Sequence, residues 1–192
     1  MEEFDYFLQA TKKDQVSTCA ENCGNAKLRR PPVHGRIKIN VDGAFEPSSR
    51  NGGVGVVFRN ASGDILGAMA VPILGRASAE MVEAEGFRIA LASPICSSEC
   101  SYSVEGDAQT VINMLQGKRQ ITACLEVIIS DILSFGSRFN SCSFVFVPRN
   151  CNRVANVLAK YVLFQESTIT WLRDFPSWVN REASLDVSLM QQ

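Results

Sequence analysis

Residues 36–45 read RIKINVDGAF, and this stretch decides how the rest of the chain is interpreted. Ile37, Ile39 and Val41 alternate with polar or charged residues, which is the period of two expected for a β-strand with one buried face. The alternation stops at an aspartate. The pattern therefore predicts a strand with Asp42 at its end.

Two apolar runs follow, GVGVVFRN at 53–60 and DILGAMAVPI at 64–73, joined by a short polar linker that contains glycine. Such a linker between apolar runs favours a β-hairpin. The next segment, SAEMVEAEGFRIALAS at 78–93, opens with Ser78, carries acids in its first turn and spaces apolar residues at helical intervals. It predicts a helix that ends near Pro94.

The second half of the chain alternates short strand patterns with helical patterns. We expect strands in SYSVEGD at 101–107 and SCSFVFV at 141–147, and helices in AQTVINMLQG at 108–117, ACLEVIISDILSFG at 123–136 and NRVANVLAKYVLF at 152–164. The order is β-β-β-α-β-α-α-β-α, which predicts an α/β domain. We expect a five-stranded mixed sheet, with three antiparallel N-terminal strands, then parallel crossovers, and helices on both faces.

Length and charge bound the organisation of the chain. Its 192 residues suit one domain with tails, and its formal net charge of −1 gives no global positive field for nucleic acid. Residues 1–35 show no sustained period and end at two prolines, so we expect a flexible leader, followed by a domain at 36–166. Residues 167–192 hold two tryptophans but no clear period, and we expect a tail that packs on the domain.

The compartment is predicted to be intracellular. The first residues, MEEFDYF, are acidic and lack the apolar core of a signal peptide, and the seven cysteines are an odd number. No run approaches the ~18 apolar residues of a membrane span, so no membrane partner is expected. Cys19 with Cys23 and Cys96 with Cys100 have a spacing that zinc could use, but no histidine accompanies either pair.

Three acids fall where α/β sheets commonly place ligands. Asp42 follows the first strand, Glu83 lies in the first turns of the first helix, and Asp107 leaves the strand at 101–107. Taken alone, these positions fit helix capping and the helix dipole as well as they fit a metal site. Spacing therefore leaves both interpretations open.

The sequence motifs that contain these acids resemble those of the ribonuclease H family, specifically its plant reverse-transcriptase-like branch, over about residues 36–166. The matching motifs, in chain order, are IKINVDGAF, GGVGVVFRNASGDIL, VEAEGFRIAL, VEGDAQTVINMLQG and FVPRNCNRVANVLAK. The tail segment TWLRDFPSWV is similar to that branch too. The resemblance implies a ribonuclease H-like fold.

The resemblance also implies a catalytic and metal-binding set. Asp42 matches the first ligand, Glu83 rather than Glu80 or Glu85 the second, and Asp107 the third. The fourth position normally follows alanine as an aspartate, but this chain reads Ala155-Asn156. Asn156 keeps a carbonyl oxygen as a candidate ligand and loses a full negative charge.

In the family, the acids hold two divalent ions, usually Mg²⁺ with Mn²⁺ able to substitute, and cleave the RNA strand of an RNA–DNA hybrid. Carboxylate oxygens without Cys or His are the ligand set that magnesium prefers. Arg149, Asn152 and Arg153 are the predicted nucleic-acid-binding residues, while Lys118 and Arg119 are equally well explained as solvated surface charges. His34, the single histidine, precedes the predicted domain and is interpreted as a bystander.

Three functions remain open from the sequence. The first is a metal-dependent endonuclease on RNA–DNA hybrids, with a rate that Asn156 impairs. The second is a non-catalytic nucleic-acid-binding module, which Asn156 and the slight negative charge favour. The third is an interaction or structural remnant of a retroelement polyprotein. The fold does not choose among them, and in each case we expect a monomer.

Overall fold

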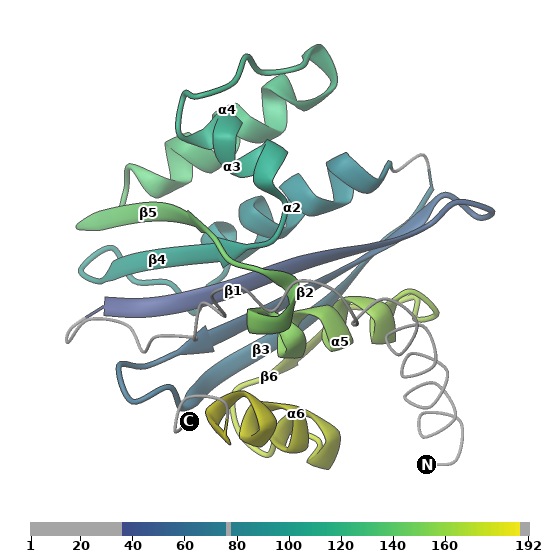
Figure 1. Cartoon of the computed structure of the whole chain (residues 1–192), viewed down its shortest axis with the longest axis vertical. Coiled ribbons are helices and arrows are strands. Elements are labelled where there is room, and N and C mark those ends of the chain that lie inside the picture. Colours follow the sequence, from purple (N-terminus) through teal and green to yellow (C-terminus); the bar gives the residue numbers. More distant parts are fainter. Residues whose placement is uncertain (1–35, 76–77, 189–192) are drawn as a thin grey trace, which may run out of the picture.

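Six strands form one mixed sheet in the order β5-β4-β1-β2-β3-β6 in the computed structural model, which describes residues 36–75 and 78–188 (Figure 1). The strands are β1 (Arg36–Glu46), β2 (Asn51–Arg59), β3 (Ile65–Ile73), β4 (Ser101–Gly106), β5 (Ser141–Phe146) and β6 (Ile169–Trp171). The prediction of five strands is wrong by one. The additional strand, β6, comes from the segment that we assigned to the C-terminal tail.

The pairing pattern agrees with the expected mixed sheet. β1, β2 and β3 pair antiparallel, and β4 and β5 run parallel to β1 on its other side. The β2–β3 hairpin turns through the polar linker, where Gly63 has a φ of 88° that favours glycine. β6 pairs antiparallel with β3 through three residues and extends that edge of the sheet.

Helices cover both faces of the sheet, as predicted (Figure 1). The helices are α2 (Ala79–Ala92), α3 (Gln109–Leu115), α4 (Glu126–Gly136), α5 (Arg153–Val162) and α6 (Ser177–Ser188), with short 3₁₀ turns η1 (Ala123–Leu125) and η2 (Arg149–Cys151). α2, α3 and α4 share the larger apolar core with one face, and α5 packs on the other face of β1, β2 and β3. Ser78 caps α2 by accepting a hydrogen bond from the Met81 N–H, as the sequence indicates.

α6 explains why the chain after 166 stays on the domain. Trp178 lies with its ring centroid 5.3 Å from that of Tyr161 on α5 and 6.3 Å from that of Trp171 on β6. Val179 is fully buried in the same cluster. The two tryptophans thus join the smaller core, and their burial offsets the cost of ordering this segment.

β1 is buried on both faces because it lies inside the sheet with helices above and below. Its predicted polar face is therefore not solvated: Lys38 and Asn40 are 5% and 2% exposed. Glu105 on β4 pairs with Lys38 at 2.8 Å and accepts a hydrogen bond of 3.1 Å from the Asn40 amide. These contacts compensate the burial of charge that the alternating pattern alone did not anticipate.

Two glycines let helices approach the strands that carry the candidate site. A Cβ on Gly43 would lie 2.8 Å from the Glu83 backbone nitrogen, so α2 could not sit as close to β1. A Cβ on Gly55 of β2 would lie 2.1 Å from the Ala155 carbonyl oxygen of α5. Glu83, and Asn156 next to Ala155, both belong to the candidate site described below, so these close approaches help to position it.

The predicted leader, its histidine and the pair Cys19 and Cys23 lie outside the described residues. Within residues 36–75 and 78–188, no helix combines the length and apolar character that a membrane crossing requires.

Candidate active site

The candidate site lies where the pairing between β1 and β4 ends and the two strands diverge. The parallel pairing of these strands ends at Asn40 opposite Glu105, whereas β1 continues to pair with β2 as far as Glu46. Asp42 therefore lies within β1 and not at its end, which corrects the prediction. Asp107 follows the last residue of β4 at the junction with α3. The divergence of two parallel strands leaves the gap into which ligands bind in α/β sheets.

Three carboxylates meet in this gap. Asp42, Glu83 and Asp107 each offer an oxygen, and these oxygens all lie within 4.8 Å of one another. Glu83 comes from the second turn of α2, and its carboxylate accepts a hydrogen bond from the backbone N–H of Gly43. The structure thus brings together the three acids that the motifs single out, from one strand, one helix and one strand end.

Asn156 lies beside Asp42, in the first turns of α5. Its side-chain amide donates a hydrogen bond of 2.9 Å to Oδ2 of Asp42, and it is 6% exposed. The amide of Asn152 donates to the other oxygen, Oδ1, at 3.3 Å and to the Val41 carbonyl oxygen at 2.7 Å. Both oxygens of the Asp42 carboxylate therefore accept an amide N–H.

Arg149 is the cation of the site. It lies in η2, between β5 and α5; its Nε donates to Oδ2 of Asp107 at 3.1 Å, and its side chain is 65% exposed. The other oxygen of Asp107, Oδ1, is buried without a hydrogen-bond partner. A buried carboxylate oxygen without a partner is costly, and it indicates a ligand that the protein itself does not supply.

Burial and crowding make the carboxyl groups of Asp42 and Glu83 hard to ionise without a cation. Burial raises the pKa of Asp42 well above its ordinary value, and the negative charges of Glu83 and Asp107 raise it further. Burial, helped by the charge of Asp107, raises the pKa of Glu83 from 4.5 to about 7. The guanidinium of Arg149 acts in the opposite direction on both.

The residues fit a hard divalent cation. Asp42, Glu83 and Asp107 supply oxygen ligands only, and the described residues contain no other cluster of three such side chains. Cys96 and Cys100 are half-buried free thiols outside this cluster, and burial raises the pKa of Cys96 to about 11, which opposes thiolate formation.

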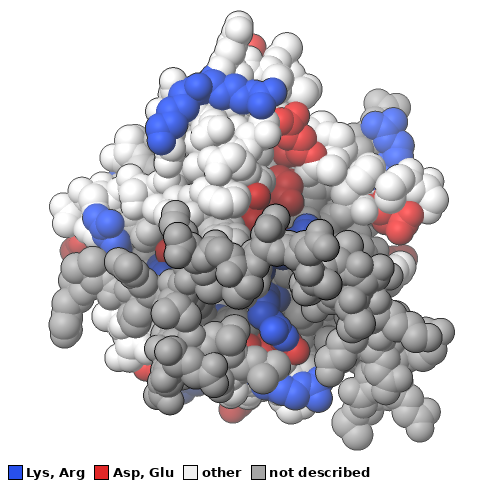
Figure 2. Space-filling view, viewed as in Figure 1, with Lys and Arg blue, Asp and Glu red and all other residues white. Residues whose placement is uncertain are grey.

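The three predicted nucleic-acid-binding residues differ in their surroundings. Arg149 is exposed, whereas Asn152 is 1% exposed and Arg153 pairs with the buried Glu182 of α6 at 2.8 Å. Figure 2 shows basic side chains at the α3–α4 end of the molecule and acidic side chains beside them toward the centre of this face. Lys118 and Arg119, in the loop after α3, are both exposed.

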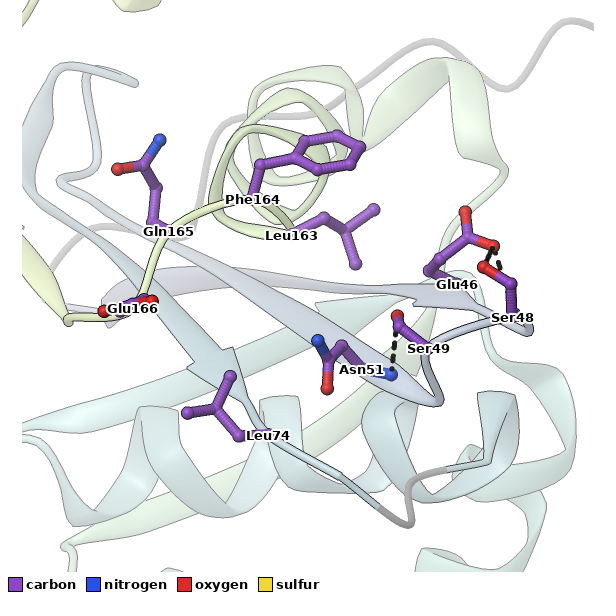
Figure 3. A pocket seen from close by; sticks show the side chains of 9 residues that line it. All are labelled: Glu46, Ser48, Ser49, Asn51, Leu74, Leu163, Phe164, Gln165 and Glu166. Atoms are coloured by element: carbon purple, nitrogen blue, oxygen red, sulfur yellow. Dashed lines mark hydrogen bonds between the residues drawn. The ribbon is translucent and has the colours of Figure 1, made fainter.

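A separate pocket lies at the far end of β1, between the β1–β2 turn, the end of β3 and the end of α5 (Figure 3). Its lining includes Leu74 and Phe164 together with Glu46 and Glu166. None of the three clustered carboxylates lines it. The pocket is therefore distinct from the candidate active site.

The fold and the site define the class of protein. A mixed sheet of this order, with acids from β1, α2 and the end of β4, is a ribonuclease H-like domain. The sequence model described as reverse transcriptase-like matches residues 40–162, and the chain belongs to that family. The match spans the elements from β1 to α5, including every residue of the candidate site.

Solved ribonuclease H structures share this fold. RNase H1 of the halophilic archaeon Halobacterium salinarum is 25% identical, with a TM-score of 0.64 over 69% of this chain and 100% of its own. The N-terminal RNase H domain of a Mycobacterium tuberculosis protein is 23% identical, with a TM-score of 0.60 over 67% and 93%. LC11-RNase H1, solved in complex with an RNA/DNA hybrid, is 21% identical, with a TM-score of 0.59 over 65% and 94%. No curated protein sequence matches the chain.

Sequence reasoning missed the role of Asn152 in the site. We expected a surface contact to nucleic acid, but its side chain ties the start of α5 to β1 and to Asp42. Its position immediately before α5 suggests a helix cap, but Asn152 makes no side-chain capping hydrogen bond, so no local signal pointed to its contact with Asp42.

Proposed function

We propose that this domain binds RNA–DNA hybrids and hydrolyses the RNA strand with divalent metal held by Asp42, Glu83 and Asp107. The observation that carries the proposal is the convergence of the three carboxylates, one of which, that of Asp107, has a buried oxygen without a hydrogen-bond partner. The fold shared with ribonucleases H, one of them solved with an RNA/DNA hybrid, supports the substrate class.

The carboxylates would hold magnesium, or manganese in its place. Metal bound there would supply an activated water and stabilise the oxygen that leaves the cleaved phosphodiester. The protein contributes preorganisation: Asn152 and Asn156 fix the Asp42 carboxylate, and the Gly43 N–H orients Glu83. Asp107 is oriented by Arg149.

Substrate selection would depend on the backbone and the shape of the hybrid. Phosphate contacts fix the register of a duplex, and 2′-hydroxyls distinguish RNA from DNA. Arg149 is the exposed donor at the rim of the carboxylate cluster. Asn152 and Arg153, whose side chains are engaged inside the protein, would act by positioning α5.

A hybrid-cleavage assay tests the proposal directly. Purified protein is incubated with a hybrid labelled on its RNA strand while Mg²⁺ or Mn²⁺ is titrated, beside an Asp42→Asn variant. We expect metal-dependent cleavage of the RNA strand in the hybrid and none of duplex DNA, with cleavage lost in Asp42→Asn. Equal cleavage by both proteins would contradict the proposal.

A second candidate function is a non-catalytic nucleic-acid-binding module of retroelement origin. The orientation of Asn156 favours it, because the amide N–H and not the carbonyl oxygen faces Asp42. Hybrid binding without cleavage at any metal concentration would select this function over the first. Binding is measured by the same labelled hybrid in fluorescence anisotropy.

A further inference from the structure

Arg149 places a permanent positive charge on the carboxylate cluster. Only its Nε is engaged with Asp107, at 3.1 Å, while its side chain stays 65% exposed. A guanidinium carries five N–H donors in a planar fork that matches phosphate oxygens. Its remaining donors are therefore free to face a phosphate brought to the carboxylates.

The charges of the site match one divalent ion. Three carboxylates and one guanidinium have a net charge of −2 when all are ionised. Two neighbouring acids do not add to this charge, because Glu105 pairs with Lys38 at 2.8 Å and Glu85 with Arg88 at 2.7 Å. After one divalent ion is bound, no net negative charge remains to hold another.

Asn156 removes the ligand that a second ion would need. Its amide N–H, held 2.9 Å from Asp42, presents a partial positive charge in place of a carboxylate. The same contact engages Oδ2 of Asp42, and Asn152 engages Oδ1. Amide donors therefore occupy the side of the Asp42 carboxylate that faces α5. Carboxylate ligands for an ion are available only on the side that faces Glu83 and Asp107.

From this arrangement we infer that the site holds a single divalent ion and that Arg149 supplies the second positive charge to the phosphate of bound nucleic acid. The inference rests on the proposed function and specifies how the same site recognises its substrate. Arg149 acts as a phosphate contact, and its salt bridge with Asp107 keeps the guanidinium beside the ion-binding carboxylates. The neutral Asn156 and the cationic Arg149 are then complementary features of one site.

The phosphate contact is tested by the salt dependence of hybrid binding. Wild type, Arg149→Gln and Arg149→Lys are compared in fluorescence anisotropy with a hybrid whose RNA strand carries 2′-fluoro sugars and resists cleavage. We expect Arg149→Gln to lower affinity about tenfold and to reduce the slope of log K against log salt by about one. Arg149→Lys should restore the slope because its charge is retained. Arg181→Gln, which changes an exposed arginine on α6, is the control and should leave both unchanged.

The ion count is measured separately from binding. Bound Mn²⁺ is quantified by electron paramagnetic resonance in the complex with the same hybrid. We expect one ion in the wild type and two in the double variant Arg149→Gln with Asn156→Asp, whose four carboxylates would have a net charge of −4. Circular dichroism and thermal unfolding establish that each variant is folded.

The possible failures are distinguishable. Two manganese ions in the wild-type complex would overturn the single-ion site, whatever the binding data show. Hybrid binding with an unchanged salt slope in Arg149→Gln would overturn the phosphate contact alone. Absence of wild-type binding to an unmodified RNA–DNA hybrid in EDTA, where cleavage does not occur, would overturn the proposed function and, with it, the role of Arg149.

Discussion

The side-chain amide of Asn156 donates a hydrogen bond to Oδ2 of Asp42 at 2.9 Å, and both residues are buried. An acid at position 156 would instead place a second carboxylate against Asp42 in a region of low dielectric. Two carboxylates at this position would repel each other unless a metal ion lay between them. The amide of Asn156 instead attracts the Asp42 carboxylate without any metal. This difference has consequences for stability as well as for activity.

Asn156→Asp should destabilise the metal-free protein and make its stability depend on magnesium. The introduced carboxylate loses the hydrogen bond to Asp42 and repels it, which should lower the unfolding free energy by about 1–3 kcal/mol in EDTA. Saturating magnesium should restore that loss, and hybrid cleavage should rise about tenfold or more. Urea unfolding with and without magnesium, together with the cleavage assay, measures both effects.

The matched control for this change is Asn156→Ala. It also removes the hydrogen bond to Asp42, but it adds no ligand for metal. We expect a comparable loss of stability that magnesium restores less well than in Asn156→Asp. An equal magnesium response in the two variants would show that the added carboxylate does not bind the ion.

The stability of the metal-free protein should fall as the pH rises toward neutrality. The Glu83 pKa is raised from 4.5 to about 7 in the fold, so between these values the folded state binds more protons than the unfolded state. Unfolding then releases protons, and raising the pH favours it by at most about 1.4 kcal/mol per pH unit for this group. The effect is absent below pH 4.5 and complete above about pH 7.

Urea unfolding in EDTA at a series of pH values tests this expectation. The raised pKa of Asp42 acts in the same direction, so Glu83→Gln should reduce the pH dependence without abolishing it. Saturating magnesium should flatten the curve, since metal favours the ionised carboxylates. A metal-free stability that increases between pH 4.5 and 7 would contradict the assigned burial of these acids.

Gly55→Ala should disrupt the packing of α5 and the site that it carries. The new Cβ would lie 2.1 Å from the Ala155 carbonyl oxygen, which belongs to the backbone and cannot move without the helix. We expect a loss of about 2–3 kcal/mol in unfolding free energy and weaker metal binding, because Asn156 would shift away from Asp42. Calorimetric titration with Mn²⁺ and thermal unfolding provide the measurements.

Gly86→Ala in α2 is the control for a glycine in a similar buried setting. There the nearest atom to a new Cβ is Val41 Cβ at 3.5 Å, an ordinary contact. Alanine is favoured over glycine inside a helix by up to about 1 kcal/mol, so stability should be unchanged or increased. Similar destabilisation by the two changes would mean that close backbone approach is not what requires Gly55.

Arg153→Ala should weaken the packing of α6 on α5. Hybrid affinity should stay within about twofold of wild type, a change in binding free energy well below the ~1.4 kcal/mol that corresponds to a tenfold change. Arg153 pairs with Glu182 at 2.8 Å, and Glu182 is 6% exposed, so its charge would be left buried without a partner. The expected cost is about 1–3 kcal/mol. Thermal unfolding measures the stability. A tenfold loss of hybrid affinity in the folded variant would instead assign Arg153 to the nucleic-acid interface.

The sequence determined the local elements and the identity of the acids. The alternation before Asp42, the serine that caps the helix of Glu83 and the apolar faces of the later helices depend on residues close together in the chain. Periodicity and capping are local effects, so the hairpin, the helices as far as α5 and the mixed character of the sheet could be predicted, whereas α6 was not. The motif resemblance then selected Asp42, Glu83 and Asp107 from the many acids of the chain.

Only the tertiary structure decided what surrounds those acids. The three residues of β6 have no period of their own and form a strand because β3 offers an unpaired edge. Asn152 reaches Val41 and Asp42 from 110 or more positions away in the chain, and Lys38 finds Glu105 across a parallel pairing. Hydrogen bonds and charges between distant residues leave no periodic signal in the sequence. The donors on Asp42, and the guanidinium beside Asp107, therefore became visible only when the strands and helices were assembled.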